Sequence, residues 1–146
     1  MPIIVQKEWY TEKQIKENPD IYFVFGDNIE RVGTGGQAKF CRNKKNCIGI
    51  VTKAKPTYDS DAFLSDDQLT YNCALISRDF WKVIFLLKKG HTIVFPADGI
   101  GTGRADLANK APLTNMYVQT MWKLCLDMSK ELEAQKQEKE LINETK

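Results

Sequence analysis

The chain has 146 residues, of which 42% are hydrophobic and 27% are charged. This is ordinary for one soluble globular domain that is long enough to bury a core. The formal net charge of +2 is too small to indicate a nucleic-acid partner, and no apolar run approaches the ~18 residues of a membrane span. The N-terminus carries no signal pattern, so we expect a cytoplasmic protein with no membrane partner.

Apolar runs and turn residues predict an alternation of strands and helices. In chain order, the predicted elements are a strand at 2–5, a helix at 11–18, a strand at 21–25, a helix from 35 or 36 to about 42, a strand at 48–52, a loop at 53–64, a helix at 65–89, a strand at 92–95 and a helix at 113–132. Thr11 is the predicted N-cap of the first helix, Ser65 opens a capping box, and Gly90 ends the third helix. This alternation implies a three-layer α/β domain with a mostly parallel central sheet flanked by helices.

The sequence predicts one domain, residues 1–132, followed by a charged segment. Residues 133–146 are mostly Glu, Lys and Gln. Their composition suits either a solvated extension of the last helix or a frayed tail. The sequence does not indicate an oligomeric state.

Two glycine-rich loops, each following a predicted strand, hold seven of the nine glycines. The first contains Gly26, Gly33, Gly35 and Gly36, and the second contains Gly99, Gly101 and Gly103. Backbone N–H groups of such loops form concavities that bind anions. Ligands of α/β sheets bind beyond the carboxyl ends of the strands, where both loops lie. We therefore expect the loops to converge on one cleft for a nucleotide or another ligand that carries phosphate.

The candidate contact residues come from these loops and from the end of the strand at 48–52. The predicted ligand-binding residues are Gly26, Asp27, Asn28, Arg31, Gly33, Thr34, Gly35, Gly36, Gln37, Thr52, Lys53, Asp98, Gly99, Ile100, Gly101, Thr102 and Gly103. Thr102 is expected to add a hydroxyl donor. Asp27 and Asn28 suit either ligand contact or local capping of the turn. Arg31 suits either a phosphate clamp or a solvated loop charge, and Lys53 either the cleft or the surface.

Several other side chains have two interpretations. Arg104 and Asp106 suit ligand contact or a salt-bridged surface, and one of Tyr58, Phe63 and Tyr71 is a candidate for stacking on a base. The aromatic residues expected in the core are Phe80, Trp81, Phe85, Tyr117 and Trp122. The cations expected on the solvated surface are Arg42, Lys44 and Lys45.

The four cysteines are scattered, and His91 is the single histidine. The spacing of Cys41 and Cys47 has no matching second pair, whereas zinc sites need about four ligands at compact spacing. We therefore expect free thiols and no metal or other cofactor.

This pattern of a strand ending in Asp, a glycine loop opening a helix, and a later Gly-Xaa-Gly-Thr-Gly loop resembles the macro domain. The more specific resemblance is to a set of small macro-like proteins of bacteriophages and bacteria, over roughly residues 20–115. The matching segments are residues 25–28, 31–38, 49–53 and 95–103. The resemblance implies a macro-domain-like fold and ADP-ribose or a related nucleotide as ligand. It places Asp27 near the adenine, residues 33–36 at the distal ribose and diphosphate, and residues 99–103 around the diphosphate.

The resemblance leaves open whether the nucleotide is bound, sequestered as a signal, or hydrolysed at an ADP-ribosyl linkage, in the host cytoplasm if the gene belongs to a phage. For a hydrolase, Asp27 and Asn28 are the predicted catalytic residues that position a water, with Arg31 or Lys53 stabilising developing charge. One alternative is a non-enzymatic protein-interaction module without a nucleotide ligand. A second alternative is a protein that binds nucleic acid through Lys39, Arg42, Lys44, Lys45 and Lys53. The near-neutral net charge of the chain argues against it.

Overall fold

A computed structural model describes residues 2–145 and shows an α/β fold around a four-stranded parallel sheet with the order β1-β4-β2-β3. The strands are β1 (Ile3–Gln6), β2 (Ile21–Asn28), β3 (Cys47–Lys53) and β4 (Thr92–Pro96). The predicted α/β class and parallel pairing are confirmed. β2 is longer than expected, so Asp27 and Asn28 belong to the strand itself rather than to the loop after it. Met1 and Lys146, at the ends of the predicted domain and tail, lie outside the described residues.

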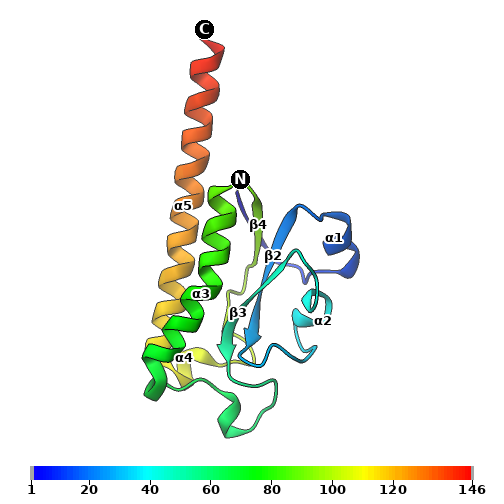
Figure 1. The fold of residues 1–146 in the computed structure, drawn as a ribbon, viewed down its shortest axis with the longest axis vertical. Helices are drawn as coiled ribbons and strands as arrows, with labels where there is room; N and C mark the ends of the chain where they lie inside the picture. The colour runs from blue at the N-terminus through cyan, green and yellow to red at the C-terminus, as the bar shows by residue number, and fades with distance from the viewer. Residues whose placement is uncertain (1, 146) are drawn as a thin grey trace.

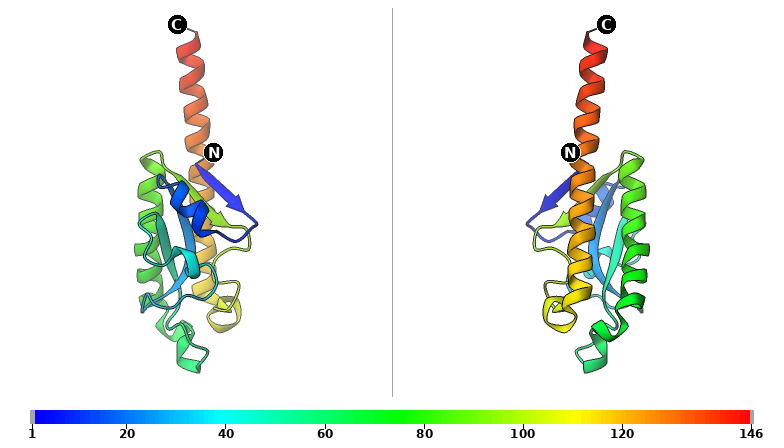
Figure 2. Two further views of the ribbon diagram at one scale, coloured as in Figure 1. Left: turned by 90° about the vertical axis from the view of Figure 1, so that its right-hand side faces the viewer. Right: turned by 90° about the vertical axis from the view of Figure 1, so that its left-hand side faces the viewer.

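Helices lie on both faces of this sheet. They are α1 (Glu12–Glu17), α2 (Ala38–Cys41), α3 (Leu69–Lys88), α4 (Leu107–Lys110) and α5 (Pro112–Glu144), with short 3-10 turns at Ser60–Ala62 and Asp66–Gln68. The long helices α3 and α5 run side by side against one face, and α1 and α2 lie against the other (Figures 1 and 2). Among residues 2–145, no helix is both long and apolar enough to cross a membrane.

Alternation along the strands produces a separate apolar cluster on each face. In β2, Val24 belongs to the large cluster beneath α3 and α5, whereas Phe23 and Phe25 belong to the smaller cluster beneath α1 and α2. Successive strand residues point to opposite faces, and both faces are covered, which explains the continuous apolar run. Each fully buried large side chain of these clusters contributes about 1.5–3 kcal/mol.

The helix signals are confirmed in part. Thr11 Oγ1 accepts a hydrogen bond from the Gln14 amide at 3.0 Å, so Thr11 caps α1 as predicted. Ser65 caps the 3-10 turn that precedes α3, and α3 itself begins at Leu69. The helix after the first glycine loop, α2, is a single turn.

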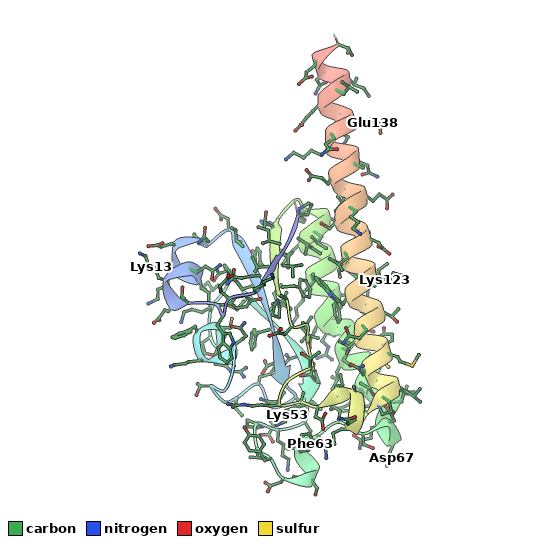
Figure 3. The ribbon with its side chains drawn as sticks, turned by 180° about the vertical axis from the view of Figure 1, so that it is seen from behind. Lys13, Lys53, Phe63, Asp67, Lys123 and Glu138 are labelled. Carbon is green, nitrogen blue, oxygen red and sulfur yellow. The ribbon has the colours of Figure 1, made fainter. Side chains whose placement is uncertain are left out.

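The C-terminal segment is an uninterrupted continuation of α5, which ends at Glu144. Within the part of this segment that the structure describes, residues 133–144 are helical, as in the first of the two interpretations. The extension runs past the end of the sheet into solvent, where Figure 3 labels Glu138. The first amides of α5 are capped by a distant side chain, because the Asp66 carboxylate accepts from the Leu113 and Thr114 amides at 2.9 Å each.

Two aromatic residues predicted for the core lie on the surface instead. Trp81 is 61% exposed and Phe85 is 57% exposed, so the prediction is wrong for both. Phe80 is fully buried, as predicted, and Tyr117 and Trp122 are partly buried against the large cluster. α3 has more apolar residues than one buried stripe can hold, and the sheet takes the stripe that includes Phe80.

The outer edge of β3 is closed by side chains. The fully buried carboxylate of Asp79 accepts a hydrogen bond from the Val51 amide at 2.9 Å, and Arg31 donates to the Gly49 carbonyl at 3.0 Å. Arg31 and Asp79 also pair with each other at 2.7 and 2.9 Å. An unpaired strand edge invites association with another strand, and this ion pair occupies its backbone groups.

Candidate functional site

Both glycine loops border one cleft at the carboxyl ends of the strands. The cleft has a volume of about 410 Å³, which is within the range of small-molecule sites. Every predicted ligand-binding residue except Arg31 lines it. The structure thus brings the candidates together, while their contacts with a ligand stay predictions. A hollow of about 650 Å³ also exists, but a single stretch, residues 66–71, lines it.

Two side chains fix the first glycine loop by hydrogen bonds to its backbone carbonyl groups. Asn28 Nδ2 donates to the Val32 carbonyl at 2.7 Å, and Arg42 Nε donates to the Gly33 carbonyl at 3.0 Å. Gly33 has a φ of +94°, and a Cβ there would lie 2.9 Å from Pro56, so this position requires glycine. The Asn28 Oδ1 atom is buried and has no hydrogen-bond partner among the described residues.

Backbone amides of both loops are left without protein acceptors. Within residues 2–145, no acceptor is found for the amides of Gly33, Thr34, Gly35 and Gly36 in the first loop, or of Ile100, Gly101, Thr102 and Gly103 in the second. Ile100 is buried and Gly36 and Gly101 are half-buried, whereas the other five residues are exposed, so water or a ligand can serve as the acceptor. Rows of such donors are typical of anion-binding concavities.

The second loop is shaped by a tight approach to α4. Gly101 has a φ of +81°, and a Cβ there would lie 2.9 Å from Leu107. Thr102 Oγ1 donates to the Asp98 carbonyl at 2.7 Å. The Thr102 hydroxyl proton stabilises the loop in this structure, and its donation to a ligand stays a prediction.

Asp27 is the centre of an ion-pair network rather than a free carboxylate. Its side chain is buried and accepts hydrogen bonds from Arg42 at 2.7 and 2.8 Å, from the Asn28 amide at 2.8 Å, and from Arg31 at 3.4 Å. Its predicted catalytic role is not tested by this geometry. Both carboxylate oxygens already accept hydrogen bonds from the protein, so Asp27 positions the Arg42 side chain and the Asn28 amide in this structure.

Two arginines differ from the sequence-based expectation. Arg42 was expected on the solvated surface, but its side chain is only 14% exposed and is paired with Asp27. Arg31 does not line the cleft and is paired with Asp79 and Asp27, while its side chain stays 39% exposed, so its role as a phosphate clamp remains a prediction. The sequence does not indicate that either arginine is ion-paired, because a charged residue in a loop has the same local sequence pattern whether it is solvated or paired with a distant carboxylate.

Two cations face the cleft without a carboxylate partner among the described residues, Lys53 and Arg104. Lys53 Nζ donates to the Thr57 carbonyl at 2.7 Å and lies 4.9 Å from the centre of the Phe63 ring, a pair labelled in Figure 3. Partial burial, and then the charge of Arg104, lower the pKa of Lys53. Arg104 reaches from the second loop to the first, since a Cβ at Gly35 would lie 2.7 Å from its Nη1 atom.

Aromatic rings stand at the rim of the cleft. Tyr58 lines it and is 67% exposed, whereas Phe63 and Tyr71 do not line it. Trp9, which the sequence analysis did not select, also lines the cleft and is 61% exposed. Its neighbour Tyr10 donates its amide hydrogen to Gln37 Oε1 at 3.1 Å, which anchors this segment at the first loop.

The fold and the site define an α/β protein with a parallel sheet and a cleft between two glycine-rich loops at the carboxyl ends of its strands. Residues 5–121 match the family described as "Family of unknown function (DUF7831)", and the chain belongs to this family. The matched region includes both glycine loops and ends within α5. No curated protein and no solved structure matches the chain significantly.

Proposed function

We propose that the cleft binds an ADP-ribose-type nucleotide and that the chain is a small three-layer domain of the macro-domain type. The observation that carries the proposal is the set of unpaired backbone amides in the two loops, which border the same cleft. A diphosphate offers acceptor oxygens to both rows of donors at once. A hydrogen bond to a charged group contributes about 1.5–3 kcal/mol, roughly twice that of a neutral pair.

The charge of the cleft suits such a ligand. Lys53 and Arg104 have no ion-pair partner among the described residues, and with Arg42 they outnumber the two carboxylates that line the cleft, Asp27 and Asp98. A diphosphate carries the complementary charge. Arg104 spans the two loops and is therefore in place to clamp the phosphates. Trp9 and Tyr58 offer exposed ring faces at the rim, which suits stacking on a base.

Hydrolysis of an ADP-ribosyl linkage by Asp27 and Asn28 stays a separate prediction. The Asp27 oxygens already accept hydrogen bonds from Arg42 and from the Asn28 amide, which favours positioning over proton transfer. Binding is therefore the function proposed here, either as recognition of ADP-ribose or as sequestration of a nucleotide signal.

Calorimetric titration with ADP-ribose, followed by mass spectrometry of the ligand, tests the proposal. We expect micromolar or tighter binding, weakened about tenfold or more in Arg104→Ala because one charged contact is lost. Lys123→Ala, a change of an exposed cation on α5, is the matched control and should bind like the wild type. A cleaved ligand would establish catalysis in addition to binding.

A titration without heat for ADP-ribose and for its cyclic and protein-linked derivatives would contradict the proposal. The interaction-module interpretation, in which the glycine loops are only turns, would then take its place. Equal affinity in Arg104→Ala and the wild type would place the ligand elsewhere on the protein.

A further inference from the structure

The outward side of α3 carries only cations and aromatic rings over its second half. Between residues 78 and 89, the exposed residues are Arg78, Trp81, Lys82, Phe85, Lys88 and Lys89, here called the α3 face. Their spacing of three and four residues puts them on one side of the helix. Asp79 is the single acidic residue between positions 69 and 88, and its carboxylate is buried and paired with Arg31.

The two aromatic side chains of the α3 face are exposed to solvent. Trp81 and Phe85 are 61% and 57% exposed, and they border a shallow apolar hollow together with Lys82 and Leu86. Four helical residues separate the two rings by roughly 6 Å along the helix axis. Lys89 Nζ lies 4.9 Å from the centre of the Phe85 ring, so a cation accompanies the aromatic pair. Single exposed apolar residues are common, whereas two large adjacent exposed rings are typical of an interaction surface.

A second hollow of about 340 Å³ borders the α3 face, and Lys82, Arg31, Arg42 and Lys44 line it. Each of these cations is paired with a carboxylate: Lys82 and Arg31 with Asp79, Arg42 with Asp27, and Lys44 with Glu12. The cations of the α3 face that have no ion-pair partner among residues 2–145 are therefore Arg78, Lys88 and Lys89.

We propose that the α3 face binds single-stranded nucleic acid, with its cations on phosphates and with Trp81 and Phe85 stacked on unpaired bases. Cations that follow the backbone and aromatic rings that stack on bases are the two components of single-strand recognition. The small net charge of the chain does not oppose this, because the acidic residues lie elsewhere, at Asp66 and Asp67 before α3 and along the extension of α5. The inference goes beyond the proposed nucleotide binding and does not depend on it.

Fluorescence anisotropy with labelled oligothymidylate and oligouridylate, and with a duplex of equal length, tests the proposal on the full chain. We expect both single strands to bind at low salt and the duplex to bind more weakly, because its bases are not free to stack. For phosphate contacts from Arg78, Lys88 and Lys89, the logarithm of the association constant should fall with the logarithm of salt concentration at a slope of about −2.

Surface variants identify the face. Trp81→Ala with Phe85→Ala should weaken binding about tenfold or more, because stacking is lost. Lys88→Glu, a change at a cation without an ion-pair partner among residues 2–145, should make the salt slope shallower by about one unit. Lys123→Glu, an equal charge reversal on α5, is the matched control and should leave binding unchanged. All these side chains are exposed, so circular dichroism should show an unchanged fold.

Absence of single-strand binding at low salt, or equal binding by the Trp81 and Phe85 variant, would overturn the proposal. A concentration-dependent dimer that this variant abolishes, without oligonucleotide binding, would also overturn it and assign the face to a second copy of the chain. The variant should bind ADP-ribose like the wild type, so failure of this proposal and failure of the cleft proposal are distinguishable.

Discussion

The Asp27 carboxylate and the Arg42 guanidinium form a two-point ion pair, with nitrogen–oxygen distances of 2.7 and 2.8 Å. Arg42 also donates to the carbonyls of Val32 and Gly33. One side chain thus connects the end of β2 to the first glycine loop. The loop that presents unpaired amides to the cleft depends on this arginine for its shape.

Removal of this arginine should loosen the first loop. Arg42→Ala leaves the buried Asp27 with the Asn28 amide and the 3.4 Å contact to Arg31 as its remaining partners, and breaking such an ion pair costs about 3 kcal/mol of unfolding free energy. Hydrogen exchange should also become faster at the two amides that close the loop, because Ala38 and Lys39 donate to the Gly35 and Gly36 carbonyls at 3.2 Å each. Urea unfolding and mass-resolved hydrogen exchange measure the two effects, with the exposed Arg78→Ala as the control. Unchanged exchange in the loop would show that Arg42 does not hold it.

Arg31 should matter for stability and not for nucleotide affinity. Arg31→Ala leaves the fully buried Asp79 with only the 3.8 Å contact to Lys82 as an ion pair, which costs about 3 kcal/mol. The double variant with Asp79→Ala should lose less than the sum of the single losses, because neither charge is then left alone. Urea unfolding tests this, and calorimetry with ADP-ribose should give wild-type affinity. Weaker nucleotide binding by a folded Arg31→Ala protein would restore the predicted phosphate clamp.

Nucleotide binding should take up protons at alkaline pH. Burial and Arg104 hold the pKa of Lys53 below its ordinary value of 10.5 in the free protein. A diphosphate beside the ammonium group favours its charged form and raises that pKa again. Affinity should therefore fall as the pH rises through the free-protein pKa. Calorimetry in buffers of different ionisation enthalpy measures the uptake, which should vanish in Lys53→Met; the same uptake in that variant would assign it to another group.

The cap of α5 should be sensitive to acid. Partial desolvation of Asp66 acts to raise its pKa, but hydrogen bonds from the Leu113 and Thr114 amides and the Thr114 hydroxyl outweigh it, so the pKa is lowered from 3.8. A lowered folded-state pKa contributes stability above the unfolded value, and this is lost as the pH falls through the folded value. Asp66→Ala should cost about 1 kcal/mol at neutral pH and almost nothing in strong acid. Asp67→Ala is the control, and an equal effect of both variants would argue against the cap.

The thiols should differ sharply in reactivity. The hydrogen bond from Cys41 and the charge of Lys44 lower the pKa of Cys47, whereas burial raises the pKa of Cys125 to about 12. A thiolate is the reactive form, so iodoacetamide should modify Cys47 first. Peptide mass spectrometry over time gives the order, and Cys47→Ser should abolish the fast phase. Early labelling of Cys125 would mean that the core opens readily.

The sheet and the loops could be predicted because their signals are local. The apolar runs at 21–25 and 92–95 have the continuous pattern of strands covered on both faces, and glycines follow them at the strand ends. Parallel pairing then brings the two loops to one edge without further information. The same reasoning predicted most of the residues that line the cleft.

Residues whose roles depend on distant partners could not be predicted in this way. Arg42 lies in a run of polar and basic residues, and only the fold reveals that it meets Asp27. On α3, helical periodicity identifies apolar positions but cannot choose which stripe the sheet covers, so Trp81 was assigned to the core. Trp9 precedes the first helix and has no local signal, because the Tyr10–Gln37 contact that brings it to the cleft spans two elements.

The helical extension of α5 holds the described C-terminal end of the chain away from the rest of the molecule. Residues 133–144 continue the helix by roughly 18 Å at 1.5 Å per residue. In Figure 1 the extension leaves the molecule at the end opposite the glycine loops. A fluorophore or surface attachment placed near Glu144 would therefore stand well clear of the cleft between the glycine loops, so the protein can be immobilised there for binding measurements with its candidate site facing solution.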